Sequence, residues 1–257
     1  MQALGRAAGR LVPLLAFLAL WQATEMLGLV NPDFLPPADA VLSALWTLAA
    51  GWTLWPELGI SLFRAFAGLA LGSLVGVALG LAMGQSRLAD RIFGPLVATT
   101  YSLPKTALVP LFILWLGVGN AANILTVFLA CLLPVVVSTY HGVRSVPPVL
   151  VWSARAMGTP ERRIMRRVLL PAALPAVLTG VRIALGFSFF LTISAEMGAS
   201  RTGIGKLIFQ FGESGSYAFM FAGIGAVVIA AFLADRALLH AIRRALHWHE
   251  AVGAIAR

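Results

Sequence analysis

The chain has 257 residues, of which 60% are hydrophobic and only 11% are charged, and its formal net charge is +9. Because a soluble domain carries about 25% charged residues, this composition excludes an ordinary soluble enzyme. The single cysteine, Cys131, also excludes an intrachain disulfide framework and a cysteine-based metal site.

The charged residues leave three long uncharged runs, at 65–86, 106–143 and 214–234. A helix crosses the hydrocarbon core of a bilayer with about 20 apolar residues. The runs therefore predict an all-α polytopic membrane protein. Lys and Arg are scattered in short clusters between the apolar runs instead of gathering on one solvated face, which argues against nucleic acid as a partner.

The first part of the chain predicts two spans with a surface helix between them. Residues 11–30 follow two arginines and predict a first transmembrane helix; a cleaved signal peptide is the alternative, but no small-residue cleavage site follows. Residues 39–55 are apolar, carry three tryptophans and stop before Pro56, which is typical of a helix lying at the membrane interface. The second span is expected at 60–84.

Glycine recurs at every fourth position of the second span, at Gly68, Gly72, Gly76, Gly80 and Gly84. Glycines at this spacing lie along one side of a helix and allow neighbouring backbones to approach closely. We expect a packing groove for another helix, with backbone lining a pore as the alternative.

The middle of the chain predicts a broken span and a bent one. Residues 85–92 form a short polar loop, and the third span, 93–116, contains three prolines and Lys105, so it is expected to be kinked or broken. A turn at 117–120 leads into the fourth span, 124–140, which Pro134 should bend.

A polar stretch, 141–171, precedes the last two spans, 172–197 and 218–239, which a loop connects. With six spans, 13 Lys and Arg residues lie on the side of the termini and the polar stretch, and 2 lie in the opposite loops. Since cytoplasmic loops carry the excess of basic residues, both termini and the polar stretch are predicted to be cytoplasmic.

Within the polar stretch, Val151–Gly158 predicts an amphipathic helix that stops at the glycine. Thr159, Pro160 and Glu161 then predict a second helix, with the threonine as its N-cap and the proline at its first position. The unit is a short helix, a tight turn and a second helix that enters the membrane.

This unit resembles the cytoplasmic "EAA" loop of the permease subunits of binding-protein-dependent ABC importers. That motif runs Glu-Ala-Ala, three residues, Gly, nine residues and Ile-x-Leu-Pro, and the residues here at matching spacing are Ala154, Gly158, Val168, Leu170 and Pro171. Trp152 replaces the glutamate of the motif, and Ser153 replaces its first alanine. Segments 61–64, 103–111, 172–175, 179–182 and 195–197 resemble the nitrate, sulfonate and taurine branch of the family.

The resemblance implies a MetI-like type I permease, a single domain over 1–257 with six transmembrane helices and a coupling loop at 141–171. Its coupling residues would be Trp152, Ser153, Ala154, Met157, Gly158, Leu170 and Pro171. It also implies a location in the cell (inner) membrane, a second permease chain forming a homodimer, two ABC ATPase subunits and a solute-binding protein. The solute would be a small anion such as a sulfonate, taurine or nitrate. ATP and magnesium would bind the ATPase, leaving this chain without cofactor, metal or catalytic residues.

Charged residues inside spans are costly and usually face protein or water. Arg182 and Lys105 could each meet an anionic substrate on the translocation path, or could contact neighbouring helices instead. Glu196, at the external end of its span, is expected to make a gating or structural contact. Arg64 and Asp235 are expected at the membrane interface.

The alternative function is a stand-alone channel or an ion-coupled secondary transporter. It would need paired carboxylates in the membrane or broken helices in both halves of an inverted repeat. Asp and Glu are nearly absent from the span interiors, and the sequence shows no inverted repeat. A membrane enzyme is disfavoured because no nucleophile or metal-binding set is evident.

Overall fold

The computed structural model describes residues 34–247 continuously, with positions 12, 16, 19–24, 27, 28 and 31 before them. Half of the positions of the predicted first span, 11–30, therefore lie outside the described residues, and the tail after residue 247 lies wholly outside them. Within the described part, every regular element is helical.

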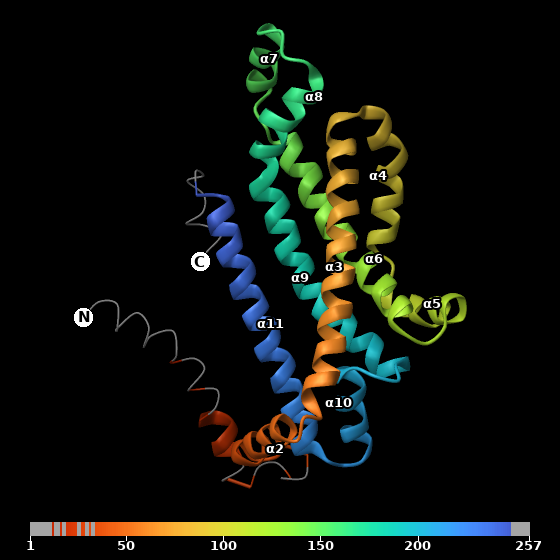
Figure 1. Ribbon diagram of the computed structural model, residues 1–257, viewed down its shortest axis with the longest axis vertical. Coiled ribbons are helices and arrows are strands. Elements are labelled where there is room, and N and C mark those ends of the chain that lie inside the picture. The colour runs from red at the N-terminus through yellow and green to blue at the C-terminus, as the bar shows by residue number, and fades with distance from the viewer. Residues whose placement is uncertain are drawn as a thin grey trace, which may run out of the picture.

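Four long helices run along the long axis of the molecule (Figure 1): α3 (Leu54–Gln85), α6 (Asn120–Arg144), α9 (Leu170–Ala199) and α11 (Tyr217–Ala245). Each is long and apolar enough to cross a bilayer. A fifth candidate is a pair bent by 94°, in which α4 (Arg87–Tyr101) is followed by the 3-10 helix η1 (Lys105–Leu108) and α5 (Val109–Leu116). Counted as one span, this pair brings the described residues to the five spans predicted for them; the sixth depends on residues 11–30.

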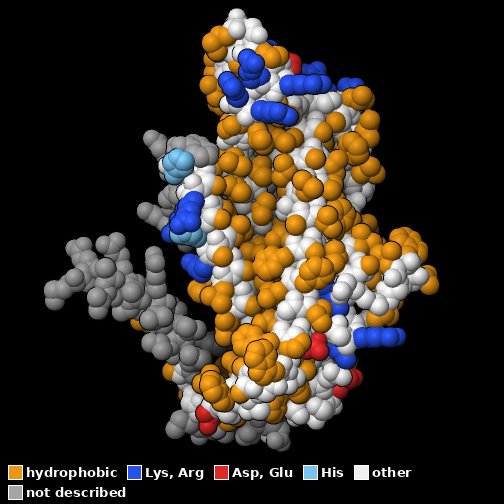
Figure 2. Space-filling view, in the orientation of Figure 1, with side chains coloured by type: hydrophobic (Ala, Val, Ile, Leu, Met, Phe, Trp, Pro, Cys, Tyr) orange, Lys and Arg blue, Asp and Glu red, His pale blue; other side chains and the backbone are white. Residues whose placement is uncertain are grey.

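The two ends of the bundle differ in chemistry. At one end project α7 (Pro148–Ala156) and α8 (Glu161–Ile164), joined to α9 by a π-helical turn, η2 (Met165–Leu169). At the other end, α2 (Ala38–Ala50) lies across the bundle and α10 (Ile204–Glu213) packs beside it (Figure 1). Lys and Arg gather over the α7 end, and apolar side chains cover most of the surface between the ends (Figure 2). This distribution suits a protein embedded in a bilayer.

The glycines of α3 pack against α6 along the whole length of the contact. A Cβ added at any of the five would lie between 2.5 and 2.9 Å from the Cβ of an α6 residue, and the α6 residues are Val127, Cys131, Val135, Thr139 and Val143. These partners also recur every fourth position, so the two helices stay in register over four turns. The predicted packing groove is confirmed, and the pore-lining alternative is wrong.

Helix α6 makes a similar close contact with α9. A Cβ at Gly180 would lie 2.6 Å from that of Ser138, and one at Gly142 would lie 2.6 Å from that of Ala176. The thiol of Cys131 donates to the carbonyl oxygen of Ala184 at 3.4 Å. Helices α3, α6 and α9 therefore form one closely packed core.

Two predicted loops and breaks are wrong near the ends of α3. Residues 85–92 are not a loop: only Ser86 interrupts the helices, and its Oγ accepts from the backbone N of Ala89 at 3.3 Å as the N-cap of α4. The predicted interfacial helix exists but ends at Ala50, and α3 already begins at Leu54. Pro56 is accommodated because a proline in the first turn lacks only an N–H that has no helical partner there.

Two further loops proved to be partly helical. Helix α6 continues to Arg144, four residues beyond the predicted span, and His141 and Arg144 of its last turn are exposed. The segment before residue 217, predicted as a loop, contains α10. Its apolar residues Ile204, Ile208 and Phe211 recur at helical spacing and pack with α2 and α11, and the glycines around them obscured that period.

We predict that Gly76→Leu destabilises the protein because its side chain must occupy space already filled by Val135. Overpacking of this kind costs about 1–3 kcal/mol. The matched control is Gly59→Leu on the same helix, since a Cβ at Gly59 meets no atom within 4 Å. The measurement is the midpoint of thermal unfolding of the purified protein. Equal midpoints for the two variants would contradict the packing groove.

Candidate functional site

Helix α7 ends in a hydrogen-bonded turn that depends on Gly158. The N–H of Gly158 donates to the carbonyl of Arg155 at 2.9 Å, and the N–H of Thr159 donates to that of Ala154 at 3.1 Å. These two bonds define a Schellman turn, with Gly158 at φ +73° in the left-handed region. The predicted stop at Gly158 is confirmed. The predicted Thr159 cap is wrong, because Pro160 occupies the N-cap and α8 begins at Glu161.

The turn presents apolar side chains at the tip of the molecule. Trp152 is 65% exposed and Met157 is 77% exposed, and Val149 and Leu150 beside them are also exposed. Ala154 instead points inward and is buried. The helix itself is Pro148–Ala156, starting three residues before the predicted Val151 because prolines suit the first turn.

The seven predicted coupling residues do not form one surface. Trp152, Ser153, Met157 and Gly158 are exposed at the tip, whereas Leu170 and Pro171 are half-buried at the start of α9. The π-helical turn at Met165–Leu169 comes directly before them, where Pro171 has no N–H for a regular helical bond. These two residues therefore belong to the connection between the loop and the membrane helix.

An ion pair closes the loop across the turn. Arg155 Nε donates to Glu161 Oε1 at 2.6 Å, and Arg155 donates a second bond from its terminal nitrogen to Glu161 Oε2 at 3.2 Å. This hydrogen bonding raises the pKa of Arg155 above its usual value. The pair is well exposed, so it orients α7 relative to α8 more than it stabilises the fold.

At the opposite end of the bundle lies a buried charge cluster centred on Arg64 of α3 and Glu196 of α9. Arg64 is 2% exposed and Glu196 is 0% exposed, and a guanidinium nitrogen donates to Glu196 Oε1 at 2.8 Å. Ser61 donates to Glu196 Oε2 at 2.7 Å, and the backbone N of Gly205 donates to the same oxygen at 3.0 Å. The pair therefore has the additional hydrogen bonds that a buried ion pair needs.

The cluster ties two further segments to α3 and α9. Arg64 Nε donates to Asn120 Oδ1 at the start of α6 at 2.8 Å, and its terminal nitrogens donate to the carbonyl and hydroxyl oxygens of Thr202 at 2.8 and 3.0 Å. Glu57 accepts from the backbone N of Gly203. The loop between α9 and α10 is thus fixed to the first turns of α3 and α6.

The cluster corrects one prediction and supports another. Arg64 does not lie at the interface, because Glu196 neutralises it inside the protein. Glu196 makes a structural contact, which is one of the two alternatives expected of it, and its role as a gate stays a prediction. The sequence contains a signal that could have predicted this pair. Arg64 and Glu196 are opposite charges, and each lies near the same predicted end of its span.

Arg182 is paired as well. Its Nε donates to Asp235 Oδ1 of α11 at 2.8 Å, and a terminal nitrogen donates to Asp235 Oδ2 at 3.3 Å. Asp235, which was predicted at the membrane interface, is thus paired with a cation of a neighbouring helix. Arg182 was expected to meet either an anionic substrate or a neighbouring helix. The structure shows the second contact, with a carboxylate of α11.

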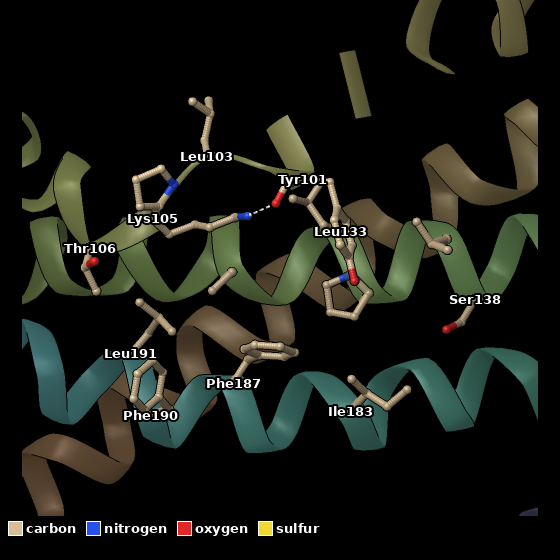
Figure 3. Close-up of a pocket in the computed structure, with 14 residues that line it drawn as sticks. Tyr101, Leu103, Lys105, Thr106, Leu133, Ser138, Ile183, Phe187, Phe190 and Leu191 are labelled. Carbon is tan, nitrogen blue, oxygen red and sulfur yellow. Dashed lines mark hydrogen bonds between the residues drawn. The ribbon is translucent and has the colours of Figure 1, made fainter. Parts of the chain in front are cut away.

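Lys105 lies at the break between α4 and α5, separate from both charge pairs. Its Nζ donates to the carbonyl oxygen of Tyr101 at 2.7 Å. Together with Tyr101 it lines a cavity of about 440 Å³ between the break, α6 and α9 (Figure 3). The structure thus brings none of Lys105, Arg182 and Glu196 together.

Comparisons with known proteins agree with this architecture. Residues 68–247 match the family model described as "Binding-protein-dependent transport system inner membrane component". The taurine transport system permease protein of Escherichia coli (strain K12) is 36% identical over 241 residues, covering 92% of this chain and 88% of its own. A permease named for aliphatic sulfonates transport in the same organism is 35% identical over 189 residues, covering 74% of this chain and 72% of its own.

Among solved structures, a chain of the MetNI methionine ABC transporter in an inward facing conformation has a similar fold. It aligns with a TM-score of 0.65 at 22% identity, covering 76% of this chain and 96% of its own. At this identity the likeness concerns the fold alone. It agrees with the MetI-like architecture expected from the sequence.

We predict that Arg64→Met or Glu196→Met alone destabilises the protein by about 3–5 kcal/mol, because each leaves a buried charge without its counter-charge. The double variant, Arg64→Met with Glu196→Met, should be less destabilised than the sum of the two. A double-mutant cycle on thermal unfolding measures the difference. Additive losses would mean that the pair is not coupled.

Proposed function

Because the chain belongs to the family of binding-protein-dependent transport system inner membrane components, and is thus a permease subunit of an ABC importer, we propose how its parts divide the work. The α7 tip binds a separate ATPase subunit. The α10 end receives the solute-binding protein, and the path between them runs beside the broken helix. The main support is the apolar α7 tip held by the Gly158 turn.

Exposed apolar side chains at a basic, water-facing end mark an interaction surface. Trp152 and Met157 can enter an apolar groove of the ATPase, with Trp152 substituting dispersion contacts for the charge contact of the usual glutamate. ATP and magnesium then bind the ATPase, and this chain contributes the mechanical connection. Motion of α7 passes through Ala154, the Arg155–Glu161 pair and the π-helical turn into α9.

We further propose that two copies of this chain form the pore as a homodimer, each with one ATPase subunit. Helix α4 buries no residue within its own chain, and Leu114 and Trp115 of α5 are exposed. A second permease chain would cover this face and close the path. The substrate is a small anion of the sulfonate, taurine or nitrate class, and the names of two relatives support taurine and aliphatic sulfonates.

We propose that the α7 end is cytoplasmic and predict the labelling pattern that follows. In a Cys131→Ser background, Arg163→Cys should resist a membrane-impermeant thiol reagent in intact cells, and Asp39→Cys should react. Both positions are exposed, and they lie at opposite ends of the bundle. Permeabilised cells, in which both should react, provide the control. The reverse pattern in intact cells would contradict the orientation.

We predict that Gly158→Val uncouples the ATPase from transport. A Cβ at Gly158 meets no atom within 4 Å, so the effect comes only from the left-handed backbone, at about 1–2 kcal/mol. The variant should insert normally and accept the binding protein, but its ATPase should no longer respond to loaded binding protein.

Gly158→Asn is the matched control, since asparagine tolerates this conformation far better than valine does. It should retain most of the stimulation. The measurement is ATP hydrolysis by the reconstituted complex with and without substrate-loaded binding protein. Full stimulation of Gly158→Val would remove α7 from the coupling role.

A further inference from the structure

The cavity beside the broken helix combines one cation with apolar walls. It has a volume of about 440 Å³, within the range of small-molecule sites. Three segments far apart in sequence form it: the break at 101–106, the middle of α6, and α9 (Figure 3). Broken helices that line a cavity are a common setting for substrate sites in transporters.

Lys105 is the only charged residue among the fourteen that line the cavity, all of them in the described part of the chain. Its Nζ lies 5.6 Å from the centre of the Tyr101 ring and donates one hydrogen bond to the Tyr101 carbonyl. An ammonium has three donors, so two remain for another acceptor. The hydroxyls of Thr106 and Ser138 line the same cavity.

The opposite wall is apolar. Ile183, Phe187 and Phe190 of α9 line the cavity, and all three side chains are substantially exposed within the single chain. Figure 3 places Phe187 and Phe190 across the cavity from Lys105. No lining residue carries a carboxylate, so a ligand's own ammonium group would find no counter-charge there.

We propose that this cavity is a binding site on the translocation path for an amphiphilic organic anion, with its headgroup at Lys105 and its apolar chain against Phe187 and Phe190. The proposal rests on the permease function above and narrows its substrate class. An alkanesulfonate satisfies both walls. Taurine carries an ammonium group that would lose its water in the cavity without gaining a carboxylate partner. An inorganic anion has no apolar chain to contact Phe187 and Phe190.

The test uses a reporter cysteine, Thr106→Cys, in the Cys131→Ser background. The complex with its ATPase is placed in phosphatidylcholine nanodiscs without binding protein, and the rate of labelling by N-ethylmaleimide is measured. Hexanesulfonate should slow the labelling, whereas methanesulfonate and taurine should need concentrations at least about tenfold higher. Ser214→Cys, exposed at the far end of α10, should label at an unchanged rate.

Two further substitutions separate the headgroup from the chain. Lys105→Gln should weaken protection by hexanesulfonate roughly tenfold to a hundredfold, and Lys105→Arg should retain it. Phe187→Ala should weaken protection by hexanesulfonate but not by methanesulfonate. Equal protection by all three anions, or full protection in Lys105→Gln, would overturn the proposal.

An anionic lipid has the same combination of charge and apolar chain. If labelling is slow in phosphatidylglycerol nanodiscs and soluble anions protect in neither lipid, the cavity is a lipid site and the proposal fails. Labelling of the permease without its ATPase distinguishes failure of the proposed function from failure of the proposed site. If the permease does not bind the ATPase but hexanesulfonate still protects Thr106→Cys, the α7 assignment is wrong and the site stands. If the complex transports and its ATPase is stimulated but no anion protects, only the site is wrong.

Discussion

The close contact between α3 and α6 is the constraint on which the rest of the structure depends. Five glycines bring the two backbones together, and neither helix can slide or rotate without driving an α6 side chain into α3. Lipid supplies no hydrophobic force between helices in a membrane, so such packing has to carry the association. Because α9 packs closely against α6 through Gly142 and Gly180, these three helices behave as one body.

The buried charge cluster extends this rigidity to the α10 end. Arg64 reaches α9, the start of α6 and the loop before α10 with one guanidinium, which presents donors in a fixed planar fork. A single lysine could not hold all three partners in this geometry. The cluster therefore positions α10 on the core, and the partner that we propose for this end would meet an ordered surface.

The elements outside the core include a broken helix and a helix with exposed apolar side chains. These are the elements to which we assign function. Helix α4 stops at Tyr101 and the chain turns sharply before α5, leaving Lys105 in a cavity. Helix α7 leaves three large apolar side chains exposed, those of Val149, Leu150 and Trp152. A broken helix with a cation in a cavity, and apolar side chains left exposed, are expected where a substrate or a partner completes the surface.

The sequence by itself determined the membrane class, four of the spans after residue 34 and their order, the glycine groove and the Gly158 turn. These follow from local features: run length, period, and the backbone preferences of glycine and proline. The helical extent of 87–92 and of α10 was missed because charges and glycines in those segments read locally as loop. Only the tertiary structure decided which charges pair, since Arg64 and Glu196 are separated by 132 residues and Arg182 and Asp235 by 53. The tertiary structure also placed Lys105 in the cavity. Whether a cation in a span meets a carboxylate or an open space depends on which helices become neighbours.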